Sequence, residues 1–220
     1  MLEERLTPYI RFHSRFASDR SSLLDQVARL CLEKGLPLMP AEGAKLLYTI
    51  TAIASPHRIV EVGAGFGYST LLLALASPQA RVISFEQDSN CYEVAHSLIF
   101  SQTIGERIEL VNADAKKGLP RLNGSFHLVF LDAAKDEYLT YLKALRPRLT
   151  VGAVIIADDI YFMGEAPGLN VSPPARIKIT QELAAFRHYI QKQDWLNTTF
   201  LPLGSGVSVS LVTKSPEGGD

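Results

Sequence analysis

Strand-like and helix-like segments alternate along most of this chain, starting at residue 58. Five short apolar segments, at 58–62, 81–86, 107–111, 126–132 and 153–159, are predicted to be strands. Amphipathic segments at about 67–76, 89–101, 115–121 and 136–148 separate them and are predicted to be helices. Strands joined through helices form right-handed crossovers, so this order predicts a parallel sheet covered by helices on both faces.

The two ends of the chain differ from this alternating core. Residues 1–56 are predicted to be helical, because apolar residues recur there at spacings of three and four. A helix at 175–193 and two strands within 197–214, joined at Leu203–Gly206, are predicted to end the sheet in an antiparallel hairpin. We interpret the chain as one domain (1–220), with N-terminal helices (1–56), an α/β core (57–214) and a mobile tail (215–220).

The composition argues against several classes of partner. Lys plus Arg (22) nearly balances Asp plus Glu (23), so no net basic charge attracts nucleic acid or an acidic membrane surface. Charges interrupt the apolar runs of the N-terminus, and no apolar run reaches the roughly 18 residues of a membrane span. Cys31 and Cys91 lack CxxC spacing and are expected to be reduced thiols. We therefore predict a cytoplasmic protein with a small-molecule partner, bound neither to nucleic acid nor to a membrane.

Acidic residues follow the predicted strands at their carboxyl ends. Ligands of open parallel sheets bind outside those ends, where the strand order reverses. The residues there are Glu61 and Gly63 after the first strand, Glu86 after the second, Asp114 after the third, Asp132 after the fourth, and Asp158 with Asp159 after the fifth. We expect this acidic edge to form the ligand site.

The glycine turn "EVGAGFG" narrows the choice of ligand. Gly63, Gly65 and Gly67 permit positive φ and close approach of a ligand, and Glu86 follows at the distance expected of an acid that binds ribose hydroxyls. A dinucleotide site favours GxGxxG, whereas here the third glycine comes one position early, and Glu61 would repel a pyrophosphate. A carboxylate at Glu61 suits the cationic amino-acid end of S-adenosylmethionine, which is the preferred cofactor. The alternative is a tight turn that binds no ligand.

Six segments carry a family pattern that is more specific than the glycine turn. They are "VEVGAGFGYSTLLLALA", "FEQD", "ADA" at 113–115, "FLDAAKDEYLTYL", "IIADD" and "TTFLPLGSGVSVSLVTK". In this order, over about residues 35–214, they resemble the cation-dependent O-methyltransferases of the catechol and caffeoyl-coenzyme A type. The resemblance implies a Rossmann-like class I methyltransferase domain with a seven-stranded, mostly parallel sheet. It also implies S-adenosylmethionine as donor, a divalent cation, and a vicinal diphenol as the small aromatic acceptor.

The resemblance also implies which residues bind the cofactor. It places the methionine and adenosine moieties against Glu61, Gly63, Gly65, Tyr68 and Ser69, the ribose on Glu86, and the adenine beside Asp114 and Ala115. Asp132 is expected to serve both the cofactor and the metal. Met39 and Glu42 fall where the family closes a helix over the cofactor, although a glutamate near a helix start is also favoured by the helix dipole.

Asp132, Asp158 and Asp159 are the predicted metal ligands. Hard divalent cations take oxygen ligands in octahedral geometry, so three side chains leave positions for two acceptor oxygens. Mg²⁺ is expected, with Mn²⁺ or Ca²⁺ as alternatives. The family commonly has Asn where this chain has Asp159, and the extra charge should strengthen cation binding while weakening activation of the acceptor. The alternative is that these aspartates only cap turns after strands.

Lys135 is the predicted general base, since the resemblance places a catalytic lysine here. A nearby divalent cation and burial would both lower its pKa toward the working pH. The alternative is a solvated lysine at the start of a helix.

Several functional points stay open on the sequence alone. The chain could be a metal-independent small-molecule methyltransferase of the same fold, or a non-catalytic S-adenosylmethionine-binding protein. The acceptor could be a free catechol, a caffeoyl conjugate or a flavonoid, and Tyr161, Phe162 and Met163 could pack against its ring. By resemblance, the opening helices are expected to form a homodimer interface.

Overall fold

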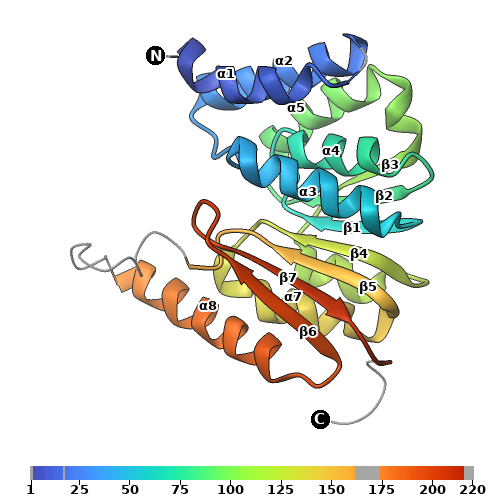
Figure 1. Cartoon of the computed structure of the whole chain (residues 1–220), viewed down its shortest axis with the longest axis vertical. Helices are drawn as coiled ribbons and strands as arrows, with labels where there is room; N and C mark the ends of the chain where they lie inside the picture. Colours follow the sequence, from blue (N-terminus) through green and yellow to red (C-terminus); the bar gives the residue numbers. More distant parts are fainter. Residues whose placement is uncertain (1, 17, 162–173, 216–220) are drawn as a thin grey trace.

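A single seven-stranded sheet organises the molecule (Figure 1). The structure is a computed structural model, and it describes residues 2–16, 18–161 and 174–215. The sheet order is β3-β2-β1-β4-β5-β7-β6. The strands are β1 (Arg58–Val62), β2 (Arg81–Glu86), β3 (Ile108–Asn112), β4 (Phe126–Leu131), β5 (Leu149–Ala157), β6 (Leu196–Leu201) and β7 (Val207–Val212). β1 to β5 pair in parallel and β7 is antiparallel to both β5 and β6, so the predicted fold class is confirmed.

Helices cover the sheet in two layers. They are α1 (Leu2–His13), α2 (Ser18–Lys34), α3 (Ala41–Ala54), α4 (Tyr68–Ala76), α5 (Ser89–Phe100), α6 (Ala115–Gly118), α7 (Tyr138–Leu145) and α8 (Pro174–Lys192). Leu128 and Phe130 of β4 face a core shared with α1 to α5, while Val129 and Leu131 face a second core with α7 and α8. Successive side chains of a strand point to opposite faces, so a β-strand that is apolar throughout needs both layers.

Two predicted helices are shorter than the sequence suggested. The segment at 115–121 is the four-residue α6 followed by the 3₁₀ turn η2 (Leu119–Arg121). The segment at 136–148 divides into η3 (Lys135–Glu137), α7 and η4 (Arg146–Arg148). Pro120 and Pro147 lie in η2 and η4, and proline supplies no N–H for an α-helical hydrogen bond. These segments therefore tighten into 3₁₀ turns.

Other boundaries also differ from the sequence-based ones. β5 begins at Leu149 rather than at residue 153, because Leu149 already pairs with Phe126 of β4. A further 3₁₀ turn, η1 (Thr103–Arg107), was not predicted. The predicted tail lies outside the described residues except for Ser215, as do the proposed acceptor contacts Phe162 and Met163. Within the described ranges, no helix is both long and apolar enough to cross a bilayer.

The topology fixes where a ligand can bind. β1 pairs with β2 on one side and with β4 on the other, so the direction of the crossovers reverses between β1 and β4. A crevice opens outside the carboxyl ends of parallel strands at such a point. The residues after β1, β2, β4 and β5 are therefore brought to one edge, as the sequence predicts.

Candidate functional site

The turn from β1 to α4 requires glycine at its first position. Gly63 has φ 100°, and a Cβ there would lie 2.1 Å from the carbonyl oxygen of Asp132. The two strand ends are this close because the Asp132 amide donates to Val62 at 2.9 Å. Gly65 and Gly67 also have positive φ, which favours glycine. The glycine turn therefore brings its main chain against the end of β4.

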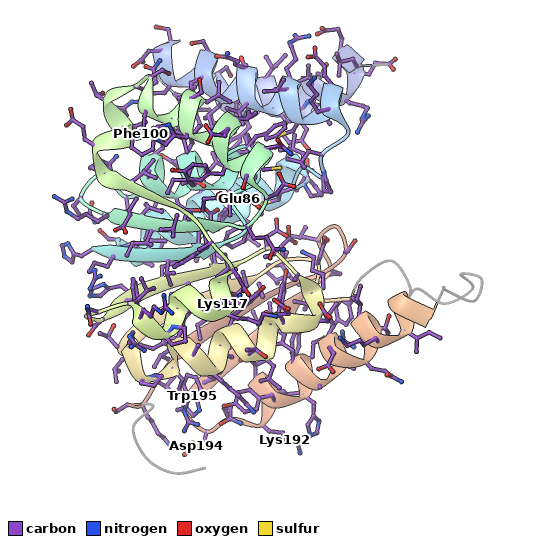
Figure 2. All side chains as sticks on the ribbon, turned by 180° about the vertical axis from the view of Figure 1, so that it is seen from behind. Glu86, Phe100, Lys117, Lys192, Asp194 and Trp195 are labelled. Atoms are coloured by element: carbon purple, nitrogen blue, oxygen red, sulfur yellow. The ribbon has the colours of Figure 1, made fainter. Side chains whose placement is uncertain are left out.

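A cavity of about 370 Å³ lies at this edge. The predicted site residues that line it are Gly63, Gly65, Glu86, Ala115, Asp132, Lys135 and Asp159. Leu36, Val62 and Phe85 add apolar walls. Figure 2 shows Glu86 in the central part of the molecule. This volume is within the range of small-molecule sites, which are mostly apolar with a few convergent polar groups.

Glu86 braces the glycine turn from the end of β2. Its Oε2 accepts the amide of Gly65 at 2.8 Å, and its Oε1 accepts the amide of Asp88 at 2.8 Å. Each carboxylate oxygen can accept more than one hydrogen bond. Glu86 can therefore hold the turn and still accept hydroxyl groups of a ligand in the cavity.

Glu61 is a fully buried carboxylate directly before the turn. The hydroxyls of Thr70 and Ser84 both donate to its Oε2 at 2.5 Å, and Ser69 also acts to lower the pKa of this carboxyl group, whereas its buried Oε1 has no partner within hydrogen-bond geometry. Burial raises the pKa of Glu61 to about 7. A buried carboxylate with one unpaired oxygen is an unfavourable arrangement that a cationic group relieves. Glu61 does not itself line the cavity, although Val62 and Gly63 beside it do.

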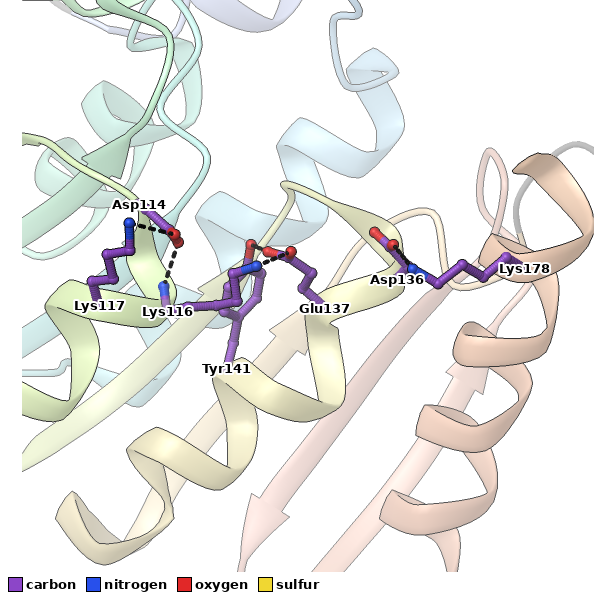
Figure 3. A network of polar contacts seen from close by, with 7 residues as sticks. All are labelled: Asp114, Lys116, Lys117, Asp136, Glu137, Tyr141 and Lys178. Carbon is purple, nitrogen blue, oxygen red and sulfur yellow. Dashed lines mark hydrogen bonds and ion pairs between the residues drawn. The ribbon is translucent and has the colours of Figure 1, made fainter.

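Five other residues predicted to bind the cofactor or metal do not line the cavity: Met39, Tyr68, Ser69, Asp114 and Asp158. Asp114 instead caps α6, accepting the amide of Lys116 at 2.9 Å (Figure 3). The Tyr68 hydroxyl lies 2.8 Å from Nε2 of His13. The main-chain oxygen of Met39 accepts the hydroxyl of Tyr9 at 2.9 Å. Glu42, the other predicted lid residue, lies 3.9 Å from Lys45 and likewise does not line this cavity.

Two of the three predicted metal ligands converge on Lys135. Its Nζ lies 2.6 Å from Oδ1 of Asp132 and 3.4 Å from Oδ2 of Asp159. Asp158 instead accepts the amide of Asp159 at 2.9 Å. In the part of the chain that the structure describes, no three His, Cys, Asp or Glu side chains are grouped to hold a metal ion. The Lys135 ammonium lies between Asp132 and Asp159, and Asp158 binds main chain, so the role of these three aspartates as metal ligands stays a prediction.

Burial and neighbouring negative charge both raise the pKa of Asp158, at the end of β5. Burial, followed by the charges of Asp132 and Asp159, raises the pKa of Asp158 to about 7. Asp159 has φ 55°, in the left-handed region that Asn and Asp tolerate better than most residues. The strand end at β5 is therefore a site with clustered negative charge and an unusual backbone conformation, both of which are common at functional positions.

With no cation beside it, the pKa of Lys135 is raised, and the lowering expected next to a divalent cation stays a prediction. Burial acts to lower it, but Tyr138, Asp132 and Asp159 together raise the pKa of Lys135 well above its ordinary value. Tyr138 accepts from the ammonium at 2.8 Å and donates to the main-chain oxygen of Asp158 at 2.9 Å. Tyr138 and the two carboxylates thus outweigh burial and keep the ammonium charged.

Comparison with known proteins agrees with this geometry. A family model described as O-methyltransferase matches residues 14–214. The chain belongs to the O-methyltransferase family. It is an O-methyltransferase by class, as the sequence predicts.

Two related O-methyltransferase sequences and one solved structure illustrate how much of this chain is matched. Catechol O-methyltransferase of Mycobacterium tuberculosis is 34% identical over 122 residues, which are 54% of this chain and 56% of that protein. Caffeoyl-CoA O-methyltransferase of Petroselinum crispum is 24% identical over 77% of this chain and 74% of that protein. The structure of the Bacillus cereus O-methyltransferase in complex with SAH has a TM-score of 0.77 and 24% identity, over 97% of this chain and 100% of that chain. This last likeness shows the shared fold.

Several residues of this O-methyltransferase site were missed from the sequence. Tyr141 lines the cavity and donates to Glu137, which also pairs with Lys116 at 2.5 Å (Figure 3). Lys178 of α8 pairs with Asp136 at 3.1 Å. The two pairs hold η3, the turn that carries Lys135, to α6 and to α8. Apolar spacing places Tyr138 and Tyr141 on one side of a helix, but only the fold shows that this side faces the site.

The predicted acceptor contact Tyr161 packs locally. Arg187 lies over its ring at 4.7 Å, and a Cβ on Gly206 would come within 2.1 Å of the ring. The ring is 38% exposed, so contact with an acceptor stays a prediction.

Replacing Glu61 by Gln should change how stability depends on pH. The folded-state pKa of about 7 lies above the ordinary 4.5, so the contribution of Glu61 to stability is complete below pH 4.5 and is lost as pH rises through 7. The variant should lack this loss and be more stable than the wild-type protein above pH 7, by roughly 2 kcal/mol. Urea unfolding at pH 5 and pH 8 measures the difference. Parallel pH profiles would contradict the raised pKa.

Proposed function

We propose that this O-methyltransferase transfers a methyl group from S-adenosylmethionine to a vicinal diphenol with the help of a divalent cation. The observation that carries the proposal is that one cavity is lined both by the proposed cofactor contacts and by the proposed catalytic and metal-binding residues. Gly63, Gly65 and Glu86 line it on the cofactor side, and Asp132, Lys135 and Asp159 line it on the side of the charged groups. A donor and an acceptor bound there would be held together, and alignment of two reactants can supply a large part of the rate enhancement.

The cofactor assignment is supported by two carboxylates with spare acceptor capacity. Glu61 has an unpaired oxygen, which would be compensated by the cationic methionine end of the cofactor. Glu86 would accept the ribose hydroxyls while it holds the amide of Gly65. The cofactor in the related Bacillus cereus structure is SAH, the demethylated product of the same donor.

The donor atoms at the ends of β4 and β5 support a cation site. Asp132 and Asp159 already converge on one positive charge, that of Lys135. Carboxylate oxygens are the ligands that Mg²⁺ prefers, and they also suit Mn²⁺ and Ca²⁺. In this proposal Asp132, Asp158 and Asp159 hold the cation. A cation held there would supply positive charge that lowers the pKa of an acceptor hydroxyl.

Lys135 has two possible states in the proposed reaction. While its ammonium contacts Asp132 and Asp159 it stays protonated, because both carboxylates raise its pKa. To accept the proton of the attacking hydroxyl, Lys135 must leave these carboxylates, and Tyr138 offers its Nζ a neutral partner at 2.8 Å. We therefore propose Lys135 as the general base and Tyr138 as the group that orients it.

A metal-independent reaction is the second candidate, and the ion pairs of Lys135 favour it. The ammonium occupies the place between Asp132 and Asp159 in the described structure. In that arrangement the acceptor hydroxyl would lose its proton to water, and Lys135 would stabilise the resulting phenolate oxygen as a fixed positive charge. The two candidates differ in their response to chelators.

Methyl transfer to ortho-diphenols should therefore depend on a divalent cation. The experiment measures transfer of labelled methyl from S-adenosylmethionine to catechol, caffeoyl and flavonoid acceptors, with Mg²⁺ and with EDTA. We expect transfer with Mg²⁺ and its loss in EDTA, restored by added Mg²⁺, because the cation would chelate both acceptor oxygens. Transfer that is equal in EDTA would support the metal-independent candidate. No transfer to any diphenol would contradict the proposed acceptor.

Replacement of Lys135 by Gln should separate chemistry from cofactor binding. We expect turnover to fall by about 100-fold or more, since an amide cannot act as the base. The SAH dissociation constant should stay within about twofold of the wild-type value, because η3 keeps its pairs to α6 and α8. Single-turnover kinetics and calorimetry measure the two quantities. Lys214→Gln, which removes an exposed ion pair with Asp194 outside the cavity lining, is the control and should retain turnover. Equal loss of turnover and of SAH binding would contradict the assigned role.

A further inference from the structure

A chain of three polar side chains, of which His13 and Tyr68 are buried and Asp25 is partly exposed, connects the N-terminal helices to the glycine turn. His13, at the end of α1, is fully buried. Its Nδ1 lies 2.5 Å from Oδ1 of Asp25 in α2, and its Nε2 lies 2.8 Å from the hydroxyl of Tyr68 in α4. The core around it is otherwise largely apolar and aromatic, and His13 contacts the rings of Phe12, Tyr9 and Tyr68. The two buried polar groups in such a core, His13 and the Tyr68 hydroxyl, call for an explanation.

The direction of the hydrogen bonds follows from their chemistry. An ionised carboxylate can only accept, so Nδ1 of His13 donates to Asp25. A neutral imidazole then presents Nε2 as an acceptor, and the Tyr68 hydroxyl donates to it. Burial lowers the pKa of His13, with Asp25 acting in the opposite direction, which agrees with a neutral ring. Asp25 thus selects the tautomer of His13 that can accept from Tyr68.

Tyr68 stands at the point where this chain can affect a ligand. It is the first residue of α4 and follows Gly67 directly, at the end of the turn whose Gly63 and Gly65 line the cavity. Its ring is buried and meets the ring of Tyr9 edge-on, with centroids 6.1 Å apart. Because its hydroxyl is bound to His13, Tyr68 is anchored toward α1 and away from the cavity that the turn lines.

Helix α1 also contacts a second segment that lines the cavity. The hydroxyl of Tyr9 donates to the main-chain oxygen of Met39 at 2.9 Å. Met39 ends the segment 36–39, in which Leu36 and Pro37 line the cavity. Helix α1 therefore contacts two separate segments that shape the cavity, one through Tyr9 and one through His13.

We propose that His13 is a positioning residue for the cofactor: oriented by Asp25, it holds Tyr68 and thereby fixes the glycine turn in the form that binds S-adenosylmethionine. The inference rests on the cofactor site proposed above and extends that site to the first two helices. Hydrogen bonds between buried polar side chains such as His13 and Tyr68 impose one arrangement on their neighbours, whereas apolar contacts alone tolerate small shifts. The turn needs such fixing, because glycine residues restrict the backbone least.

The test measures SAH binding by calorimetry in variants that interrupt the chain. Tyr68→Phe removes the hydroxyl and keeps the ring, and His13→Leu removes both ring nitrogens. Each should raise the SAH dissociation constant by about tenfold, the equivalent of one lost buried hydrogen bond. The double variant should be no weaker than either single one, because both interrupt the same chain. His13→Gln, which can still accept from Tyr68, should bind more tightly than His13→Leu. In each of these variants the KM for S-adenosylmethionine should rise by a larger factor than kcat falls.

Two controls separate positioning from general stability. Val27→Ala removes buried apolar atoms from α2 and should lower the melting temperature without changing the SAH dissociation constant. Arg29→Ala breaks the exposed α1–α2 pair with Glu3 and should change neither. The inference would be overturned if the SAH dissociation constants of Tyr68→Phe and His13→Leu stayed within twofold of the wild-type value. It would also be overturned if these variants bound SAH no more weakly than a Val27→Ala protein of equal stability. If His13→Leu does not fold, Tyr68→Phe alone decides. Failure of the wild-type protein to bind SAH would instead overturn the proposed cofactor site.

Discussion

The burial of a carboxylate at the end of β1 is the constraint on which the site depends. Glu61 lies in the centre of the sheet, where a charged group is unfavourable unless it is paired. Thr70 and Ser84 satisfy one oxygen, and the other has no partner. An apolar residue would be the more stable choice at such a position. The arrangement is understandable if the missing partner is a cationic ligand, held where Gly63 brings the main chain against Asp132.

The remaining charges at this edge are balanced in pairs. Lys135 compensates Asp132 and Asp159, and the turn that carries it is held to α6 and α8 by two ion pairs. On the opposite side, the network of His13, Asp25 and Tyr68 joins the first two helices to the glycine turn. The cavity is therefore supported by helices of both layers. The predicted homodimer through the opening helices stays a prediction.

The sequence predicts the layers of the fold more reliably than the contacts of the site. Apolar periodicity and strand order bring Glu61, Glu86, Asp132 and Asp159 to one edge, because the carboxyl ends of parallel strands must meet there. Periodicity does not give side-chain directions in loops, so it could not reveal that Asp158 binds main chain or that Lys135 lies between two aspartates. The role of His13 depends on contacts between residues 12 to 55 positions apart, which a reading of local segments does not detect.

The most direct test of this account is the proton balance of cofactor binding. Titration of S-adenosylmethionine by calorimetry at pH 6 to 8, in buffers of different ionisation enthalpy, gives the number of protons released. Binding of the cationic S-adenosylmethionine should make Glu61 ionise. We therefore predict that the wild-type protein releases up to about one proton near pH 6.5 and that its affinity for S-adenosylmethionine rises as pH rises through 7. The Glu61→Gln variant should show neither effect. Equal proton release by both proteins, or none by the wild type, would contradict the pairing of Glu61 with the cofactor.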